Sequence, residues 1–299
     1  MNHVLTLVGN PAASPLDATL VASVAAALSA AGGQVGEADW LAPGIACDLG
    51  FAGLTAAQTE EIARQTIGTR AVDLYAGPMA GRRKALLIAD MDSTIITLEC
   101  IDELADFAGI KHEIAAITER AMRGELDFEQ ALTERIARMK GLPRTDLERC
   151  HAERVRLMAG ARTLVRTMSA HGAFTALVSG GFTFFTERVA AMAGFTVQRA
   201  NILLFEDDRL AGVARPILGA EAKLHALEEF RTAQSLGPAE TLAVGDGAND
   251  IPMIQAAGLG VAYHAKPKTA AAARARVDHG DLTALLYFQG YRQADFVID

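Results

Sequence analysis

The sequence predicts an α/β protein with a Rossmann-like parallel sheet carrying helices on both faces, a helical cap insert, and a small N-terminal α+β domain. Three observations support this fold class. From Lys84 onward, short apolar runs alternate with helical patterns, which is typical of a parallel sheet covered by helices. A long helical segment separates the first two of these runs. Residues 1 to about 80 follow a different order of elements.

The N-terminal segment shows strand and helix patterns in the order βαββαβ. The segments are HVLTLVG, LDATLVASVAAALSAAG, QVGEADWL, GIACDLGF, AAQTEEIARQTIG and AVDLYAG. This order is similar to that of the ACT-like domains, which implies amino-acid binding or dimerisation, and a plain packing role is an equally good interpretation. The stretch GPMAGRRK then reads as a linker. We therefore expect a regulatory or dimerisation domain over residues 1–80 and a second domain over residues 81–299.

The second domain contains four apolar runs that we expect to be strands: ALLIAD, FTALVS, TLAVGD and GLGVAY. Helices are predicted at FFTERVAAMAG, AEAKLHALEEF and TAAAARAR. An insert of roughly residues 97–160 between the first two strands is too long for a simple crossover, so we expect a cap over the site. The segment NILLFEDDRLAG predicts a hairpin that turns at Asp207 and Asp208.

Composition narrows the class of protein. A chain of 299 residues with 51% hydrophobic content can form a substantial core. The net charge is −8 and the basic residues are scattered, which argues against a nucleic-acid partner. Because no run of about 18 apolar residues occurs, we expect no membrane association. Cys47, Cys100 and Cys150 show no paired framework, and MNHVLTLVGNP has no basic leader region, so we expect free thiols and a cytoplasmic location.

Residues able to perform chemistry follow three of the predicted strands. Asp90 ends ALLIAD, with Asp92 two positions later; Ser179 begins an SGG turn; and Asp246 ends TLAVGD. Ligands of a doubly wound sheet bind beyond the carboxyl ends of its strands. We therefore expect these side chains to share one pocket.

The turn after Asp246 adds Asn249 and Asp250, which a helical start would bring close to it. Several carboxylates in one pocket repel one another unless a cation lies among them. An all-oxygen set of ligands favours Mg²⁺, because zinc would require histidine or cysteine ligands that this cluster lacks. We therefore expect magnesium as the cofactor.

Each motif alone has an ordinary structural explanation as a turn or a helix cap, but their joint order is hard to obtain by chance. DMDST, SGG, Lys223 and GDGAND resemble the four motifs of the haloacid-dehalogenase-like phosphohydrolases. Within that superfamily, ECIDELADFAG and FEQALTERIARMKGLP are similar to the phosphoserine phosphatase family. The resemblance runs from about Lys84 to the C-terminus. One departure is Thr183 in SGGFT, where aspartate is commoner; the position lies outside the core set, so we expect catalysis to survive.

The resemblance implies a role for each motif residue. Asp90 is the nucleophile that forms an aspartyl-phosphate, and Asp92 is the general acid and base. Side-chain oxygens of Asp90 and Asp246 and the backbone carbonyl of Asp92 hold magnesium, with Asp250 supporting from nearby. The residues implied to bind the substrate phosphate are Ser179, Gly180, Lys223 and Asn249.

The helix predicted at FEQALTERIARM carries an arginine, Arg135, within its apolar stripe of Phe128, Ala131, Leu132, Ile136 and Met139. An arginine on that face costs free energy unless it is paired, so Arg135 has either a structural carboxylate partner or a substrate carboxylate. The resemblance implies the second, with Glu99 binding the substrate ammonium and Met122 and Phe128 closing the lid.

These expectations combine into magnesium-dependent hydrolysis of O-phospho-L-serine to L-serine and phosphate, the last step of serine biosynthesis, with a homodimer left open. The alternatives are another small phosphomonoester, phosphoryl transfer to an alcohol such as homoserine, and a non-catalytic amino-acid sensor. A receiver-type signalling module also phosphorylates an aspartate, but it would lack Asp92 and the cap. Intact Asp90, Asp92, Lys223 and Asp246 argue against the sensor.

Overall fold

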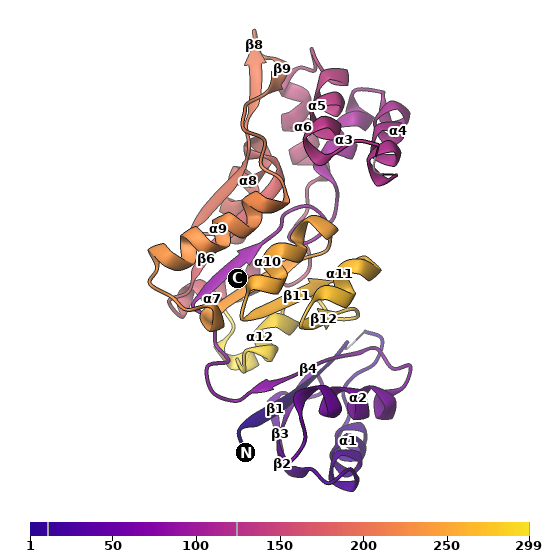
Figure 1. Cartoon of the computed structure of the whole chain (residues 1–299), viewed down its shortest axis with the longest axis vertical. Helices are drawn as coiled ribbons and strands as arrows, with labels where there is room; N and C mark the ends of the chain where they lie inside the picture. The colour runs from indigo at the N-terminus through magenta and orange to yellow at the C-terminus, as the bar shows by residue number, and fades with distance from the viewer. Residues whose placement is uncertain (11, 124, 299) are drawn as a thin grey trace.

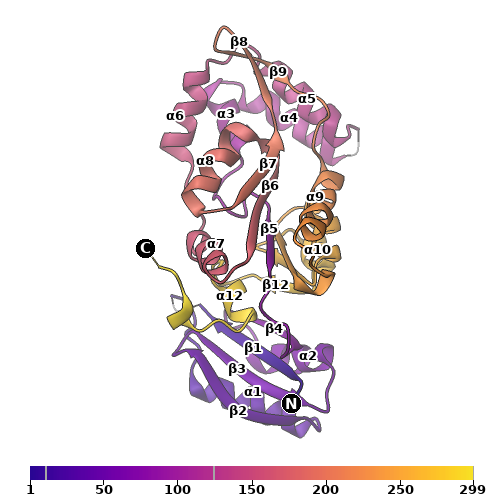
Figure 2. The ribbon, with the colours of Figure 1, turned by 90° about the vertical axis from the view of Figure 1, so that its left-hand side faces the viewer.

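The computed structural model describes residues 1–10, 12–123 and 125–298. Figure 1 shows an elongated molecule with a small N-terminal sheet at one end, helices of a cap at the other, and a larger sheet between them. Figure 2 shows the same three parts, the N-terminal sheet, the larger sheet and the cap, from the side. The predicted α/β fold class is confirmed.

The N-terminal part is a four-stranded antiparallel sheet with two helices. Its sheet has the strand order β2-β3-β1-β4. Helix α1 begins after Asp17, whose carboxylate accepts a bond from the Leu20 N–H at 2.7 Å, and Thr55 and Gln58 form a capping box at the start of α2. The elements, in the predicted βαββαβ order, are β1 (His3–Gly9), α1 (Ala18–Ala30), β2 (Gln34–Ala42), β3 (Ala46–Ala52), α2 (Ala56–Ile67) and β4 (Val72–Pro78).

The larger sheet has six parallel strands in the order β12-β11-β10-β5-β6-β7. Four of them are the predicted strands, and β7 and β12 lie at the two edges, where the sequence pattern did not reveal them. The strands are β5 (Leu86–Ala89), β6 (Phe174–Phe182), β7 (Val197–Asn201), β10 (Thr241–Gly245), β11 (Leu259–Tyr263) and β12 (Ala275–Val277).

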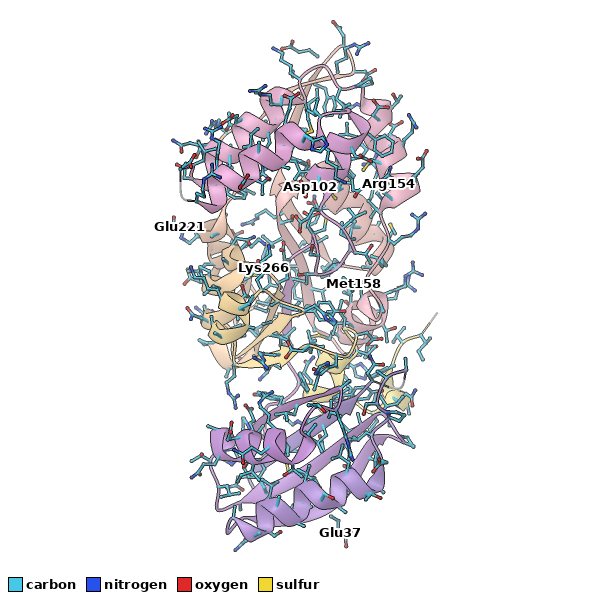
Figure 3. The ribbon with its side chains drawn as sticks, turned by 90° about the vertical axis from the view of Figure 1, so that its right-hand side faces the viewer. Glu37, Asp102, Arg154, Met158, Glu221 and Lys266 are labelled. Atoms are coloured by element: carbon cyan, nitrogen blue, oxygen red, sulfur yellow. The ribbon has the colours of Figure 1, made fainter. Side chains whose placement is uncertain are left out.

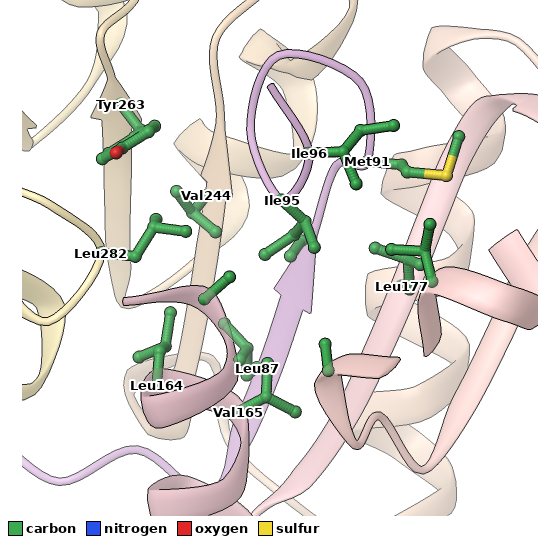
Figure 4. Close-up of a cluster of buried hydrophobic side chains, with 14 of the residues drawn as sticks. Leu87, Met91, Ile95, Ile96, Leu164, Val165, Leu177, Val244, Tyr263 and Leu282 are labelled. Carbon is green, nitrogen blue, oxygen red and sulfur yellow. The ribbon is translucent and has the colours of Figure 1, made fainter. Parts of the chain in front are cut away.

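Alternate residues of the central strands pack on opposite faces of this sheet. Leu87 and Leu177 belong to the larger core cluster, together with α7 and α12, whereas Leu86 and Val178 pack with α9 and α10. Figure 4 shows part of the first cluster, with Leu164 of α7 facing the sheet. Burial on both faces explains why the strands are almost continuously apolar. The helices are α7 (Ala161–Ala170), α8 (Thr183–Ala193), α9 (Ala220–Ala233), α10 (Ile251–Ala256), α11 (Pro267–Ala272) and α12 (Ala284–Phe288).

The predicted helix TAAAARAR is only partly correct. Helix α11 ends at Ala272, and Ala275 to Val277 form the edge strand β12, in which Ala275 pairs with Val261 of β11. Alanine favours a helix locally. Pairing with the open edge of β11 overrides that preference, because the strand also packs against β4 of the N-terminal sheet.

Of the helices that the described residues form between β5 and β6, the first four make up the predicted cap: α3 (Cys100–Phe107), α4 (Lys111–Met122), α5 (Phe128–Arg138) and α6 (Arg144–Arg154). They lie beyond the carboxyl end of β5 (Figure 1). The predicted hairpin is also present, as β8 (Leu203–Glu206) and β9 (Arg209–Val213). It supports the cap, because the Gly141 N–H donates to the Leu210 carbonyl at 2.7 Å.

The three cysteines are free and buried, as expected. None of the helices formed by the described residues combines the length and apolar character that crossing a bilayer requires.

Candidate active site

The carboxyl ends of three neighbouring strands meet at one cavity of about 320 Å³. Asp90 follows β5, Ser179 lies within the end of β6, and Asp246 follows β10. The structure therefore brings together residues that the sequence separates by up to 156 positions, from Asp90 to Asp246. The predicted residues that line the cavity are Asp90, Asp92, Glu99, Phe128, Arg135, Ser179, Gly180, Asp246 and Asn249.

Lys223 and Asp250 lie directly behind this cavity and complete a buried charge cluster. The Lys223 Nζ atom lies 2.6 Å from Oδ1 of Asp90 and 2.6 Å from Oδ1 of Asp250. Burial alone would lower the pKa of Lys223, but the two adjoining carboxylates raise it above its usual value. Burial, and then the charge of Asp250, raise the pKa of Asp90 well above its usual value. One ammonium group thus forms ion pairs with two carboxylates.

Asp90 has one carboxylate oxygen that is held by protein donors. Its Oδ1 accepts from the Met91 N–H at 2.8 Å and lies beside the Lys223 ammonium. Among the described residues, no side chain or backbone group donates a hydrogen bond to Oδ2. The second oxygen is therefore the one available to a ligand.

Asp92 lies beside Asp90 in an environment suited to proton transfer. Its Oδ1 accepts from the Cys100 N–H at 3.0 Å, and its Oδ2 lies 3.5 Å from the Ser179 hydroxyl. Burial, and then the charge of Glu99, raise the pKa of Asp92 to about 7. A carboxyl group that titrates near neutral pH can both donate and accept a proton.

The Ser179–Gly181 segment leaves the regular strand pairing. The register between β6 and β7 shifts between Val178 and Phe182, which is a bulge of the kind often found beside active sites. The Ser179 hydroxyl accepts from the Gly181 N–H at 2.8 Å. Gly180 lies directly under the cap, because a Cβ there would lie 2.9 Å from Cζ of Phe128 and would displace that ring.

Three carboxylates of the site could hold a metal ion. Oxygens of Asp90, Asp246 and Asp250 lie within 4.8 Å of one another. Burial, and then the charge of Asp250, raise the pKa of Asp246 to about 6. Lys223 supplies a single positive charge to this set, and all the donors are oxygens. A hard, oxygen-preferring cation therefore fits the cluster.

On the cap side, α5 places Arg135 in the cavity. Burial lowers the pKa of Arg135, and the charges of Asp102 and Glu99 oppose that effect. Its Nε donates to the Ala131 carbonyl at 3.3 Å, and no carboxylate of the described residues forms an ion pair with it. The structural carboxylate partner that the sequence left open is therefore not found in the described part of the chain.

Two of the other cap residues, Phe128 and Glu99, have side-chain contacts at the site. Phe128 begins α5 and lies over Gly180. Glu99 precedes α3 and accepts from the Ser93 hydroxyl at 2.6 Å. Met122 is the last residue of α4, and its side chain lies outside the described part of the structure.

Two charged residues of the cavity were missed by the sequence analysis. Asp102 lines it from α3 and Lys266 from the start of α11. Figure 3 shows Asp102 on the cap side and Lys266 on the core side. Asp102 follows Glu99 by three residues, and Lys266 follows the end of β11. The helix-face and strand-end rules could therefore have indicated both.

Comparisons with known proteins identify the family of this chain. The sequence model of the haloacid dehalogenase-like hydrolase family matches residues 84–258. Phosphoserine phosphatase from Haemophilus influenzae is 43% identical over 202 residues, which are 67% of this chain but only 64% of that protein. Phosphoserine phosphatase from Streptomyces coelicolor is 38% identical over 296 residues, covering 96% of this chain and 70% of the relative.

A solved structure extends the similarity to both sheets. The probable phosphoserine phosphatase from Vibrio cholerae matches with a TM-score of 0.79 at 30% identity, covering 98% of this chain and 88% of that one. The chain is a phosphatase that belongs to the haloacid dehalogenase-like hydrolases and, among them, to the phosphoserine phosphatase family.

Proposed function

We propose that the protein hydrolyses O-phospho-L-serine to L-serine and phosphate with Mg²⁺ as cofactor, as the last step of serine biosynthesis. One observation carries the substrate: the guanidinium of Arg135 projects into the same cavity as Asp90 and has no ion-pair partner within the described residues. A desolvated arginine of this kind suits a carboxylate ligand. A phosphomonoester that also has a carboxylate can place its phosphate at Asp90 and its carboxylate at Arg135.

Asp90 and Asp92 divide the chemistry between them. Oδ2 of Asp90 attacks phosphorus, and the bond to the serine oxygen breaks as Asp92 gives that oxygen its proton. A water molecule then attacks the aspartyl-phosphate, Asp92 takes its proton, and phosphate and the free Asp90 carboxylate result. The raised pKa of Asp92, about 7, lets it act in both directions.

The donors around the phosphate match the charge that develops on it. We assign the phosphate oxygens to the Ser179 hydroxyl, the Gly180 N–H and the Lys223 ammonium, with Asn249 at the edge of the cavity. Magnesium would be held by side chains of Asp90 and Asp246 and the Asp92 carbonyl, with Asp250 nearby. When bound, it neutralises the carboxylates and the phosphate charge.

The cap residues would select the amino acid. Arg135 binds the substrate carboxylate, Glu99 and its neighbouring acidic residue Asp102 favour the ammonium, and Phe128 and Met122 cover the substrate. Together these groups recognise a zwitterion and disfavour simpler phosphomonoesters.

The division of the chain belongs to the same proposal. Residues 81–299 contain the catalytic site and its cap, at about 97–160, and residues 1–80 form an ACT-like regulatory or dimerisation domain. Supporting this role, β2 is an edge strand of the N-terminal sheet and much of it is exposed. Buried free thiols at Cys47, Cys100 and Cys150 support a reducing, cytoplasmic location.

The substrate is tested by comparing phosphoserine with phosphoethanolamine, which lacks the carboxylate. We expect Arg135→Ala to lower kcat/KM for phosphoserine by roughly 2 to 4 kcal/mol in transition-state free energy, mainly through KM, and to change phosphoethanolamine turnover little. The matched control is Arg138→Ala on the same helix, whose exposed side chain pairs with Glu113. Equal losses on both substrates with an unchanged melting temperature would refute the role of Arg135.

A second experiment compares a panel of phosphomonoesters. Another compound with a higher kcat/KM than phosphoserine would refute the substrate assignment.

A further inference from the structure

Asn201, the last residue of β7, is a buried polar side chain outside the recognised motifs. It is 2% exposed and lies within the protein between two segments of the active site. Its amide group forms three hydrogen bonds, all to backbone atoms. A buried amide whose donors and acceptor are all used in this way restrains the segments that it joins.

The first segment is the bulge that carries Gly180. Nδ2 of Asn201 donates to the Gly180 carbonyl at 2.8 Å. Because the bulge removes Gly180 from the regular strand pairing, this carbonyl needs a partner from outside the ladder. Holding this carbonyl fixes the planar peptide group that Gly180 shares with Gly181, whose N–H donates to the Ser179 hydroxyl at 2.8 Å. It also restricts the rotation about the Gly180 backbone that would otherwise turn the Gly180 N–H.

The second segment leads into the helix that carries Lys223. Oδ1 of Asn201 accepts from the Leu218 N–H at 2.7 Å, and Nδ2 also donates to the Leu218 carbonyl at 3.3 Å. Leu218 is followed by Gly219, and α9 begins at the next residue, with Lys223 in its first turn. A single side chain thus joins the Gly180 segment to the start of the Lys223 helix.

Phe128 of the cap rests on both joined segments. A Cβ on Gly180 would lie 2.9 Å from Cζ of Phe128, and one on Gly219 would lie 3.3 Å from its Cδ1. The phenyl ring therefore rests on two glycines whose segments are joined by the hydrogen bonds of Asn201.

We propose that Asn201 is a positioning residue for phosphoryl transfer. Its amide holds the Gly180 N–H and the Lys223 ammonium at the separation at which both meet one phosphoryl group. This inference rests on the proposed phosphoryl transfer at Asp90, but not on the identity of the leaving alcohol.

The test uses Asn201→Ala and the full-length enzyme loaded with Mg²⁺. We expect kcat/KM to fall roughly 10- to 100-fold, by the same factor for phosphoserine and for p-nitrophenyl phosphate, because the loss concerns the phosphoryl group that both share. The matched control is Thr186→Val, which removes a partly buried hydrogen bond between α8 and Gln198 of β7. It should lower the melting temperature and leave kcat/KM within about twofold of wild type.

A second variant, Asn201→Asp, gives a pH signature that a purely structural role would not produce. The protonated carboxyl can donate to the Gly180 carbonyl and accept from the Leu218 N–H, as the amide does, whereas the ionised form places negative charge against two carbonyls. Its activity relative to wild type should therefore be highest at low pH and fall several-fold as the introduced group ionises. Asn201→Ala should show no such trend.

Several results would overturn the proposal. These are near-wild-type kcat/KM in a folded Asn201→Ala protein, a loss confined to phosphoserine, or loss of the fold in both variants at every pH. If phosphoserine proves not to be the substrate, the same ratios are measured with the best substrate of the panel. Failure of the substrate assignment and failure of the Asn201 role are then separate results.

Discussion

Two buried charge clusters lie at opposite ends of β5, and they are balanced differently. Before the strand, Arg82 pairs with Asp48 of the N-terminal sheet at 2.6 Å, with side chains only 13% and 8% exposed. The same guanidinium donates to the Thr6 hydroxyl at 2.8 Å and the Tyr287 carbonyl at 3.3 Å. After the strand, Lys223 faces Asp90 and Asp250, with Asp246 close by.

The difference distinguishes a structural cluster from the cluster that we propose to be catalytic. The Arg82 cluster, formed by Arg82, Asp48 and Thr6, contains one cation for one anion. The bond from Arg82 to the Tyr287 carbonyl links the N-terminal sheet to the larger domain. The Asp90 cluster, formed by Asp90, Asp246, Asp250 and Lys223, contains three carboxylates and one ammonium. Burial, and then the charge of Asp250, raise the pKa values of Asp90 and Asp246. Negative charge that the protein's own cations do not neutralise indicates a cation-binding site.

The largest expected effect comes from Asp90→Asn. An amide is a poor nucleophile, so kcat should fall by at least about 10⁴-fold. The fold should remain, because Lys223 keeps its contact with Asp250. Phosphate release and thermal melting measure the two quantities. Beryllofluoride should bind the unmodified site and not the variant. Normal turnover, once mass spectrometry has excluded deamidation, would remove Asp90 from its assigned role.

Metal removal should abolish activity reversibly. EDTA should silence the enzyme and Mg²⁺ should restore it, because Lys223 offsets only part of the negative charge of the three carboxylates in the Asp90 cluster. Calcium should inhibit, since its larger coordination shell can draw both oxygens of Asp90 away from the substrate. EDTA should leave the ion pair of the Arg82 cluster, and the stability that it contributes, unchanged. Full activity in metal-free buffer would contradict the prediction.

Breaking the Arg82 cluster should affect stability and spare chemistry. Arg82→Met leaves Asp48 buried without its partner, which should cost about 3 kcal/mol of stability. The double variant Arg82→Met/Asp48→Asn should recover part of that loss. Trp40, the one tryptophan of the chain, lies on β2 and reports unfolding of the N-terminal sheet by fluorescence. We expect its urea transition to move to lower concentration while kcat/KM of the folded enzyme stays constant. A fall in kcat/KM without a shift of that transition would contradict this assignment.

The smallest effect concerns pH. The pKa values of Asp246, about 6, and Asp92, about 7, lie above those of ordinary aspartates. Between roughly pH 4 and 7 the folded, metal-free protein therefore binds more protons at these groups than the unfolded chain does. Their contribution to stability is largest at low pH and falls as pH rises through this window.

Asp246→Asn tests the sign of this effect. It should reduce the stability difference between pH 5 and pH 7.5, measured in EDTA, by on the order of 1 kcal/mol after allowance for solvent screening. Thr186→Val, which removes a hydrogen bond to the uncharged Gln198 and alters no titratable group, serves as the control and should leave the difference unchanged. An Asp246→Asn protein with a larger pH difference than wild type would show that the sign is wrong.

Local patterns were enough to predict most helices and the strands that lie inside the sheet. Strands buried on both faces are continuously apolar, and the capping residues Asp17 and Thr55 mark helix starts in the sequence itself. The edge strands β7 and β12 escaped prediction, because their short segments become strands only by pairing with a neighbour.

The sequence by itself determined which residues follow each strand, and the parallel order of the strands then brings Asp90, Ser179 and Asp246 to one edge. Only the tertiary structure decided which distant groups touch. Asn201 bonds to Gly180 across 21 positions, and Arg82 pairs with Asp48 across 34. Such contacts join elements whose separation depends on how whole helices and sheets pack. No local periodicity encodes them, because the free energy of each bond is gained only after that packing is complete.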